Sequence, residues 1–410
     1  MNKNLTKAVA AAVLAMGASA ANAGITIPAG DWTIDIGGNA NAYYTNTRFS
    51  GALESNTKGT FTHDTANMVS TGLLPSALGI GGKTRQSDLD IAFQVTFFTG
   101  INSCGGMGSS SGGSGCNGAD GGSLNIRQSY LTFGDKSWGT IKAGRDLGLF
   151  GSDAILSDMT LLGVGQGAGG AGSSTLGRIG AGYMYADWVG QFQYSSPNWN
   201  GFSFAAAIRE PWGNNTNHDL GFDAKASYEW GGDFSGKVWV GGLHQKLRSG
   251  TGVNTNSDSA RAWEIGGKVG FAGAELVGYY YDGKNMGVPA MLGSLGLPAT
   301  EGTGLLLTSS GDRDIKGGYV QGTYKIPNIG TKIGLSWGES RMDSKQSLDG
   351  VNNDDFKDKS WVLGVYHPLT KSLNLVAEYT DTKIEGIGFQ SGPNTDGKAR
   401  TMALGAILFF

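Results

Sequence analysis

The chain offers few side chains of the kinds that act as nucleophiles, general bases or metal ligands. None of its four histidines stands beside a serine or an aspartate in a recognisable nucleophile motif. Two cysteines, Cys104 and Cys116, lie in a segment too rich in glycine to pack a core, and no histidine or carboxylate cluster beside them would complete a metal site. These residues favour neither catalysis nor a bound metal or other cofactor. The histidines are His63, His218, His244 and His367.

Charged side chains in and around one long segment indicate a different chemistry. Between Asp146 and Gly177 the sequence is too apolar to remain in solvent and too rich in glycine to form a strand, so we expect it to fold inward. Asp153 and Asp158 are its candidate acids. Opposed charges across a narrow aqueous passage would create a transverse field that orients dipolar solutes. The bases expected to face these acids are Arg127, Lys142, Arg145 and Arg178.

Strand parity divides three of these bases into two groups. Lys142 has inward parity, but Arg127 alternates in step with Leu131 and Phe133, which are apolar. Arg145 likewise alternates in step with the apolar residues Ile141 and Ala143. Both arginines would therefore face outward unless a β-bulge intervenes or they lie above the lipid band.

On both sides of the charged segment, apolar and polar side chains alternate with a period of two residues. From Leu89 to Phe97 every second side chain is apolar, and the same alternation recurs in 263–271, 332–338 and 373–380. A wall between lipid and water must be apolar on one face and polar on the other, and a tilted strand needs about ten residues to cross the hydrocarbon layer. These segments are therefore expected to be membrane strands.

Short and long connections alternate along the chain. Seven tight turns, the first near Thr84 to Ser87 and the last near Pro368 to Ser372, alternate with eight long polar connections. This predicts an all-β fold: a 16-stranded antiparallel transmembrane β-barrel with short periplasmic turns, long external loops and an inward-folded third loop, residues 146–177. An even strand number closes the sheet without an unpaired edge. Pro75 makes the second strand, around Val69 to Lys83, the least regular.

The first 23 residues have the features of a secretory signal peptide. A basic start precedes an apolar stretch from Ala8 to Ala18, and a triplet of small residues ends at Ala23. We expect cleavage between Ala23 and Gly24. Residues 1–23 would then be the signal peptide and residues 24–410 the barrel domain.

Composition excludes several classes of protein. The 71 glycines, 10% aromatic and 16% charged residues are atypical of a soluble α/β protein, whose helices need more Lys, Glu and Ala. After Gly24 no run of roughly 18 apolar residues could form a membrane helix. Loss of two lysines with the signal peptide changes the formal charge from −3 to −5, which gives no basic surface for nucleic acid.

The two cysteines are expected to form a disulfide. In an oxidising envelope Cys104 and Cys116 would close a loop of about a dozen residues and contribute about 3 kcal/mol through chain entropy. The alternative, a pair of metal ligands, lacks partners in the surrounding sequence.

Ten aromatic residues near predicted strand ends have two interpretations. Amphipathic rings favour the headgroup zone, so an interfacial girdle is the expected one. A row of aromatic rings inside the lumen would instead indicate a sugar-specific channel. These residues are Trp32, Tyr43, Tyr44, Trp188, Trp199, Trp239, Tyr279, Tyr280, Tyr281 and Trp361.

Several motifs occur in a fixed order along the chain. Arg127–Asp146 has a strand, a turn and a strand before the inward segment; Gln193–Phe204 contains Tyr-Ser-Ser-Pro followed by Gly-Phe; Tyr366–Tyr379 contains a Thr-Lys turn; and the chain ends in Phe410. In order and spacing these motifs resemble the Gram-negative general porins, particularly the betaproteobacterial and neisserial branch.

The resemblance implies a homotrimer in the outer membrane of a Gram-negative bacterium, in contact with lipid and lipopolysaccharide. It also implies that the barrel-assembly machinery recognises the C-terminal strand ending in Phe410. Small ions and hydrophilic solutes would pass through the pore. Three departures from the family pattern, Ala77, Leu162 and Leu408, mean that ion selectivity cannot be carried over.

A general diffusion porin is the function that the sequence favours, and a substrate-specific channel of the same architecture is the alternative. An outer-membrane enzyme is disfavoured because no histidine stands in a recognisable nucleophile motif, and an adhesive barrel would lack conductance. If Asp158 lies at the constriction, Asp158→Asn should shift selectivity toward anions.

Overall fold

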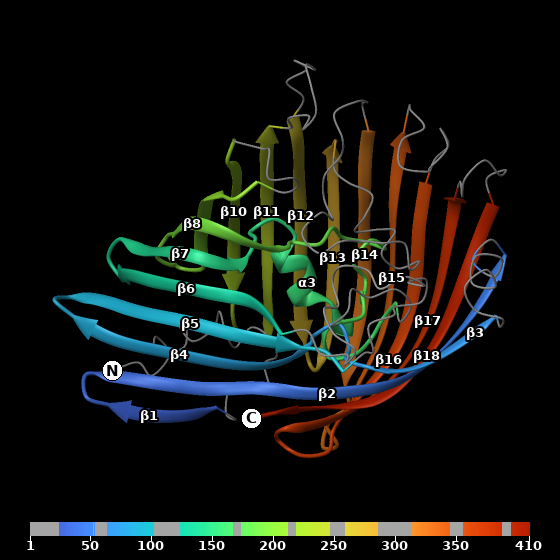
Figure 1. Cartoon of the computed structure of the whole chain (residues 1–410), viewed down its shortest axis with the longest axis horizontal. Helices are drawn as coiled ribbons and strands as arrows, with labels where there is room; N and C mark the ends of the chain where they lie inside the picture. The colour runs from blue at the N-terminus through green and yellow to red at the C-terminus, as the bar shows by residue number, and fades with distance from the viewer. Residues whose placement is uncertain are drawn as a thin grey trace.

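A computed structural model describes residues 24–51, 53, 64–101, 124–166, 174–211, 219–246, 259–285, 313–344, 356–387 and 395–410. Within these residues the chain is mostly β-strand, and hydrogen bonds join the strands into one antiparallel sheet (Figure 1). The expected signal peptide and the expected Cys104–Cys116 disulfide lie outside the described residues.

Sixteen of the described strands form a closed ring. β2 (Trp32–Gly51) pairs with β18 (Thr395–Phe409) on one side and with β4 (Ser76–Gln86) on the other, and β9 (Phe202–Arg209) pairs with β10 (Gly221–Trp230). The predicted 16-stranded barrel is confirmed. The other strands of the ring are β5 (Leu89–Thr99), β6 (Asn125–Asp135), β7 (Gly139–Leu147), β8 (Trp188–Ser195), β11 (Phe234–Lys246), β12 (Ser259–Phe271), β13 (Ala274–Lys284), β14 (Arg313–Lys325), β15 (Lys332–Ser344), β16 (Phe356–Pro368) and β17 (Leu373–Ile387).

A further strand, β3 (Thr65–Ser70), reflects an interruption of the second barrel strand. β3 pairs with Tyr43 to Arg48 of β2, whereas β4 pairs with Thr33 to Asn39 of the same strand. The break lies between them and includes Pro75, which has no N–H to donate to a sheet. The irregularity expected around this proline is therefore present.

The other additional strand, β1 (Ile25–Ala29), continues the line of β18. β18 ends with Phe409 opposite Asn39 of β2, and β1 begins with Ile25 opposite Ile36. Between them, Phe410 and Gly38 exchange two backbone hydrogen bonds of 2.8 and 3.1 Å. Residues from the two ends of the described chain thus share one strand position in the wall.

The short turns lie at or beside their predicted positions. Two of them, Ser87-Asp88 and Ala272-Gly273, contain only two residues, and all four residues have positive φ between 46° and 86°. This is the turn geometry that matches the right-handed twist of the flanking strands.

Alternation places apolar side chains outside and polar side chains inside. Ile265 and Leu335 are 51% and 57% exposed on the outer face, whereas the inward-facing Glu264 and Gln321 are almost fully buried. The two-residue rhythm of the sequence is therefore the alternation between the two faces of the barrel wall.

The wall is uneven in height. β7, β8 and β9 contain nine, eight and eight residues, whereas β17 and β18 contain 15 each. We call β4 to β9 the low wall and β10 to β18 the tall wall. In Figure 1 the strands of the tall wall stand upright, and the strands of the low wall run across the view in front of them.

The connection formed by residues 148–187 is called the inner loop, and its described parts, 148–166 and 174–187, lie inside the barrel. It begins at Gly148 rather than Asp146 and continues to Asp187, because β7 extends to Leu147 and β8 begins at Trp188. The inner loop contains a short helix, α3 (Ser152–Ser157), which Figure 1 shows within the ring, and a 3₁₀ turn, η2 (Met159–Leu162). None of the helices among the described residues has the length and apolar character to cross a membrane.

Candidate constriction site

The inner loop is attached to the tall wall by side chains that the wall turns inward. At the start of α3, the backbone N–H of Gly151 donates to Oε2 of Glu264 at 2.8 Å, and the Tyr279 hydroxyl donates to the same oxygen at 2.7 Å. The Tyr319 hydroxyl donates to the carbonyl oxygen of Ala154 at 2.8 Å. Residues of β12, β13 and β14 therefore fix the first turn of this helix.

Gln321 of β14 fixes the other end of α3. Its Nε2 donates to the carbonyl oxygen of Ser157 at 2.9 Å, and its Oε1 accepts from the backbone N–H of Met159 at 2.8 Å. The last carbonyls of a helix have no partner within the helix. One side-chain amide thus supplies both a donor and an acceptor where the backbone leaves α3.

Glu378 of β17 holds the segment after η2. Its carboxylate accepts from the backbone N–H groups of Val164 and Gly165 at 2.8 and 2.7 Å and from the Tyr366 hydroxyl at 2.6 Å. A Cβ at Gly163 would lie 2.1 Å from Oε1 of Glu378. The glycines of this segment are therefore needed for the close approach of the backbone to a buried carboxylate.

Asp153 is held against the tall wall by two lysines. Its carboxylate lies 2.8 Å from Nζ of Lys225 and 2.6 Å from Nζ of Lys237. Burial raises the pKa of Asp153, but the two ammonium groups together outweigh burial and hold this pKa below its ordinary value. The predicted acid is therefore ionised, and its partners are on the same side of the lumen as the loop.

Asp158 and Arg178 lie inside the loop itself. Asp158 accepts from the Tyr183 hydroxyl at 2.8 Å and from the hydroxyl and backbone N–H of Thr160 at 2.7 and 2.9 Å. Arg178 is fully buried and donates to the carbonyl oxygen of Ser336 at 2.7 Å. Both charged groups stabilise the folded loop, and neither is exposed to the passage.

On the low wall, Lys142 faces inward as its parity predicted. Its Nζ forms a short contact with the Asp146 carboxylate and lies 5.0 Å from the centre of the Tyr130 ring. The other oxygen of Asp146 accepts from Nε2 of Gln128 at 3.0 Å. The charge of Lys142 is therefore balanced within the wall.

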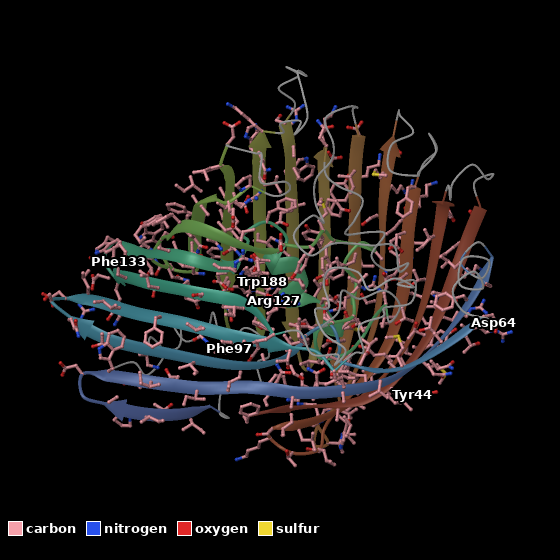
Figure 2. The ribbon with its side chains drawn as sticks, in the orientation of Figure 1. Tyr44, Asp64, Phe97, Arg127, Phe133 and Trp188 are labelled. Carbon is pink, nitrogen blue, oxygen red and sulfur yellow. The ribbon has the colours of Figure 1, made fainter. Side chains whose placement is uncertain are left out.

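Arg127 faces inward because a β-bulge is present. The register of β5 and β6 shifts so that Thr96 pairs with Gln128 and Phe97 with Ile126, which leaves Arg127 as the extra residue. Its guanidinium carbon lies 5.4 Å from the centre of the inward Phe98 ring, and Figure 2 shows Arg127 near Trp188, whose ring also packs on Phe98.

Arg145 keeps its outward parity and does not join the other predicted residues. It is exposed, donates from Nη1 to the carbonyl oxygen of Trp188 at 3.0 Å and lies 3.8 Å from the Glu210 carboxylate. Of the six charged residues singled out in the sequence, Arg145 alone is directed away from the lumen.

The girdle interpretation is correct for only part of the aromatic set. Tyr44, Trp199, Tyr280 and Trp361 are exposed on the outer face. The prediction is wrong for the inward-facing rings, because consecutive residues of a strand point to opposite faces, and a run such as Tyr279 to Tyr281 cannot be entirely outward. The inward rings are buried beneath the inner loop, so they offer no open surface to a sugar. They are Tyr43, Trp239, Tyr279 and Tyr281.

Sequence analysis did not identify the wall residues that bind the loop. Strand parity shows that Lys225, Lys237, Glu264, Gln321 and Glu378 are inward-facing polar residues, but the same is true of many others. What distinguishes them is the path of the inner loop, which the rhythm of a strand does not encode.

The described residues contain no group of three or more His, Cys, Asp and Glu side chains that could hold a metal ion. The polar groups around the inner loop are instead bonded to each other and to its backbone. Their arrangement can narrow a passage and present charge to solutes.

Known proteins match the chain in sequence pattern and in fold. Residues 9–386 match the family model described as Gram-negative porin. No curated protein matches the chain. A Salmonella typhi OmpF structure in complex with daunomycin is 17% identical over 94% of this chain and 100% of that chain, with a TM-score of 0.61.

Two further solved structures have a similar fold. The outer membrane channel DcaP of Acinetobacter baumannii is 16% identical over 95% of this chain and 100% of that chain, with a TM-score of 0.59. The trimer form of in-vitro folded OmpT, an outer membrane protein of Vibrio cholerae, is 14% identical over 92% and 99% of the two chains, with a TM-score of 0.56. At these identities the likeness is one of fold.

Proposed function

The chain belongs to the Gram-negative porins, channels for passive diffusion across the outer membrane, and we propose that its constriction lies between the inner loop and the low wall. The observation that carries this proposal is the attachment of the loop to the tall wall through Glu264, Gln321 and Glu378. A loop fixed to one side of a closed ring leaves the passage on the other side.

The charges beside this passage are mostly paired. Asp153 has two lysine partners, Asp146 has Lys142, and Asp35 lies 2.9 Å from Nζ of Lys83. Because each acid is balanced by a nearby base, the net field along the pore is small. We therefore propose a general porin with weak preference between small anions and cations.

Conductance in planar bilayers tests this proposal. The expected result is an ohmic current that rises in proportion to salt concentration, with a reversal potential close to zero in a potassium chloride gradient. Absence of conductance from correctly folded protein would contradict the channel, and a large reversal potential would contradict the balanced constriction.

A substrate-specific channel of the same architecture is the second candidate. The observation in its favour is the inward cluster of Trp239, Tyr279 and Tyr281, whose neighbouring rings lie 6.1 to 6.4 Å apart. Their burial beneath the inner loop argues against contact with solute. Saturable block of the current by a sugar at low concentration would favour this alternative.

We also propose that three copies associate through the low wall. β8 and β9 contain eight residues each, fewer than the 9–11 or so that a tilted strand needs to cross the hydrocarbon layer. A neighbouring barrel would cover this short wall. One structure of similar fold is described as a trimer form. Light scattering of the protein in detergent should give the mass of three chains.

The ends of the chain support proposals on export and assembly. Gly24 lies beside the end of β18, since a Cβ at Gly37 would be 3.1 Å from the Phe410 carbonyl oxygen and 3.6 Å from Cα of Gly24. Cleavage between Ala23 and Gly24 would leave the new amino group in this strand line, and N-terminal sequencing tests it.

We propose that the barrel-assembly machinery recognises the strand ending in Phe410, so Phe410→Ala should slow assembly.

Two expectations from the sequence complete the proposal. A disulfide between Cys104 and Cys116 should appear as a mobility change on reduction that Cys104→Ser abolishes. The chain should have no hydrolytic activity, because none of its histidines stands in a recognisable nucleophile motif, and measurable lipase or protease turnover would contradict this.

A further inference from the structure

The second barrel strand has an inward bulge between β3 and β4. In the ladder with β2, six residues of this strand, 71–76, lie opposite only three residues of β2, 40–42. A β-bulge usually adds one residue, whereas this one adds three. Residues 71–75 are all buried, and we call them the β3–β4 bulge.

Two asparagines of β2 bind the backbone of the β3–β4 bulge. Oδ1 of Asn41 accepts from the N–H of Gly72 at 2.9 Å, and its Nδ2 donates to the carbonyl oxygen of Leu74 at 2.9 Å. Nδ2 of Asn39 donates to the carbonyl oxygen of Pro75 at 3.1 Å. Backbone groups that leave the ladder of a membrane barrel need such partners, because lipid offers none. The asparagine side chains therefore replace ladder bonds that the bulge lacks.

The inner loop supplies further partners to the same bulge. The N–H of Leu73 donates to the carbonyl oxygen of Gly163 at 2.9 Å. In the other direction, the N–H of Thr175 donates to the carbonyl oxygen of Gly72 at 3.0 Å. The loop and the bulge thus satisfy each other's backbone groups. The two segments of the loop that meet the bulge, called its far end, are 162–166 and 174–177.

Close packing accompanies these hydrogen bonds. The side chain of Leu73 lies directly against the loop backbone, since a Cβ at Gly177 would be 2.3 Å from its Cδ2. The Tyr43 hydroxyl of β2 donates to the carbonyl oxygen of Leu162 at 2.7 Å. Because β2 pairs with β18 on one side and with β4 on the other, the far end of the loop is attached at the border between the two walls.

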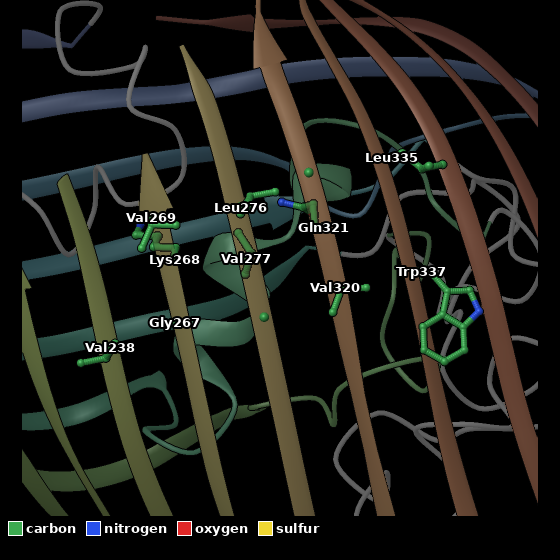
Figure 3. A pocket seen from close by; sticks show the side chains of 12 residues that line it. Val238, Gly267, Lys268, Val269, Leu276, Val277, Val320, Gln321, Leu335 and Trp337 are labelled. Carbon is green, nitrogen blue, oxygen red and sulfur yellow. The ribbon is translucent and has the colours of Figure 1, made fainter. Parts of the chain in front are cut away.

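Contact with the loop, and not backbone conformation, requires glycine at position 72. Gly72 does not have a positive φ. A Cβ there would lie 2.7 Å from the Tyr43 ring and 2.2 Å from the carbonyl oxygen of Gly163, a backbone atom that can move only with the loop. Gly278 is the opposite case. It lines a shallow groove on the outer face of the tall wall, and a Cβ there would meet no atom within 4 Å (Figure 3).

Pro75 alone does not account for the bulge. A proline removes one N–H from a ladder, and a one-residue bulge or an edge position is enough to accommodate it. Here the strand has three extra residues, and two residues of the bulge, Gly72 and Leu73, bind the backbone of the inner loop. The size and direction of the bulge therefore match the loop rather than the proline.

We propose that the β3–β4 bulge is a binding site for the far end of the inner loop, and that Gly72 and Asn41 set the width of the passage. The inference rests on the proposed constriction between the inner loop and the low wall. Glu264, Gln321 and Glu378 hold the loop against the tall wall. The bulge holds its far end where the low wall begins, so the loop has one position relative to that wall and the passage has one width.

Gly72→Ala tests this proposal with the smallest possible side chain. The protein is reconstituted in planar bilayers, and the size limit of the passage is measured from the single-channel current in neutral polyethylene glycols of graded mass. Asn41→Ala is the second variant, because it removes the side-chain partner of the Gly72 N–H and of the Leu74 carbonyl oxygen.

Gly79→Ala and Asn374→Ala are the matched controls. Gly79 faces inward on β4, and a Cβ there would meet the end of the Gln94 side chain at 2.8 Å, which can move without the loop. Asn374 is a buried, inward-facing asparagine of β17. Within the described part of the chain, neither residue forms a hydrogen bond with the inner loop.

Gly72→Ala and Asn41→Ala should each admit larger polymers and increase the fluctuation of the current, whereas both controls should conduct as the unmodified protein does. Amide hydrogen exchange followed by NMR is the local measurement. The N–H of Thr175 should exchange about tenfold faster in Gly72→Ala, as the loss of one or two hydrogen bonds implies. A general loss of barrel stability would instead speed exchange in distant strands such as β12 as well.

An unchanged size limit in Gly72→Ala would overturn the proposal, and so would an equal increase in Gly79→Ala. Faster exchange throughout the barrel with an unchanged size limit would also overturn it, because the bulge would then serve only the stability of the wall. Absence of conductance from the unmodified protein would concern the proposed function, and the exchange of Thr175 would still test the attachment of the loop.

Discussion

Two buried glutamines, one in each wall, show how differently the two sides of the lumen are used. Gln321 of the tall wall bonds to the inner loop at Ser157 and Met159. Among the described residues, Gln94 of the low wall bonds to Val95 and Thr96 of its own strand. Both face inward and both are buried, so inward polarity does not by itself identify a residue that shapes the pore.

The carboxylates repeat this contrast. Glu264 and Glu378 of the tall wall accept hydrogen bonds from backbone N–H groups of the loop. Asp146, at the end of β7, pairs with Lys142 and with Gln128 of its own wall. The tall wall therefore supports the constriction, and the low wall presents a self-contained polar surface to the passage.

The largest effect is expected from Glu378→Ala. The substitution leaves the N–H groups of Val164 and Gly165 and the Tyr366 hydroxyl without their acceptor, at a cost of about 1–3 kcal/mol for each group that stays buried. The inner loop should detach locally and single-channel current should rise and fluctuate. Gln128→Ala on the low wall is the control and should leave the current steady; equal currents in the two variants would remove the distinction between the walls.

A smaller effect is expected from the glutamine pair. Gln321→Ala removes two bonds to the ends of α3 and η2, whereas Gln94→Ala removes bonds within one strand. Limited proteolysis of the folded barrel should therefore cut within the inner loop faster in Gln321→Ala only. Equal rates of cleavage would show that the loop is fixed by other contacts.

Asp153→Asn is expected to change ion selectivity more than Asp158→Asn does. The first substitution takes a carboxylate partner from Lys225 and leaves Lys237 with Glu229, so one positive charge is gained and the ion selectivity should shift toward anions. Asp158 is buried among Tyr183 and Thr160, so its replacement should act mainly on loop stability. If Asp158→Asn shifted the reversal potential more than Asp153→Asn does, Asp158 would be assigned to the constriction.

The effect of Asp153 should persist in mild acid. Because the lysines hold its pKa below the ordinary value of about 3.9, the carboxylate stays charged as the pH falls from 7 to 4 and is neutralised only below that range. The difference in reversal potential between the unmodified protein and Asp153→Asn should therefore be the same at both pH values. Its disappearance by pH 4 would mean that the lysine partners are not in place.

The smallest effect is expected from Arg145→Gln. Its side chain lies outside the lumen near Glu210, so ion selectivity should not change. Arg127→Gln is the informative comparison, since the bulge in β6 turns Arg127 inward, and its loss should shift the reversal potential slightly toward cations. A shift produced by Arg145→Gln alone would reverse this assignment.

The sequence by itself determined the strands, the short turns and the closed 16-stranded barrel, because alternation and turn chemistry are local properties of the chain. It also showed that Lys142 faces inward. The inward turn of Arg127 depended on a bulge, which parity allowed but did not locate.

Tertiary structure alone decided which inward-facing residues form the site. Glu264, Gln321 and Glu378 look like any other lumen-facing polar residues until the inner loop lies against them, and Asp158 looks like a pore acid until Tyr183 and Thr160 enclose it. Contacts between a loop and strands more than 100 residues away depend on the path of the loop through space. The alternation of polar and apolar residues along a strand does not encode that path.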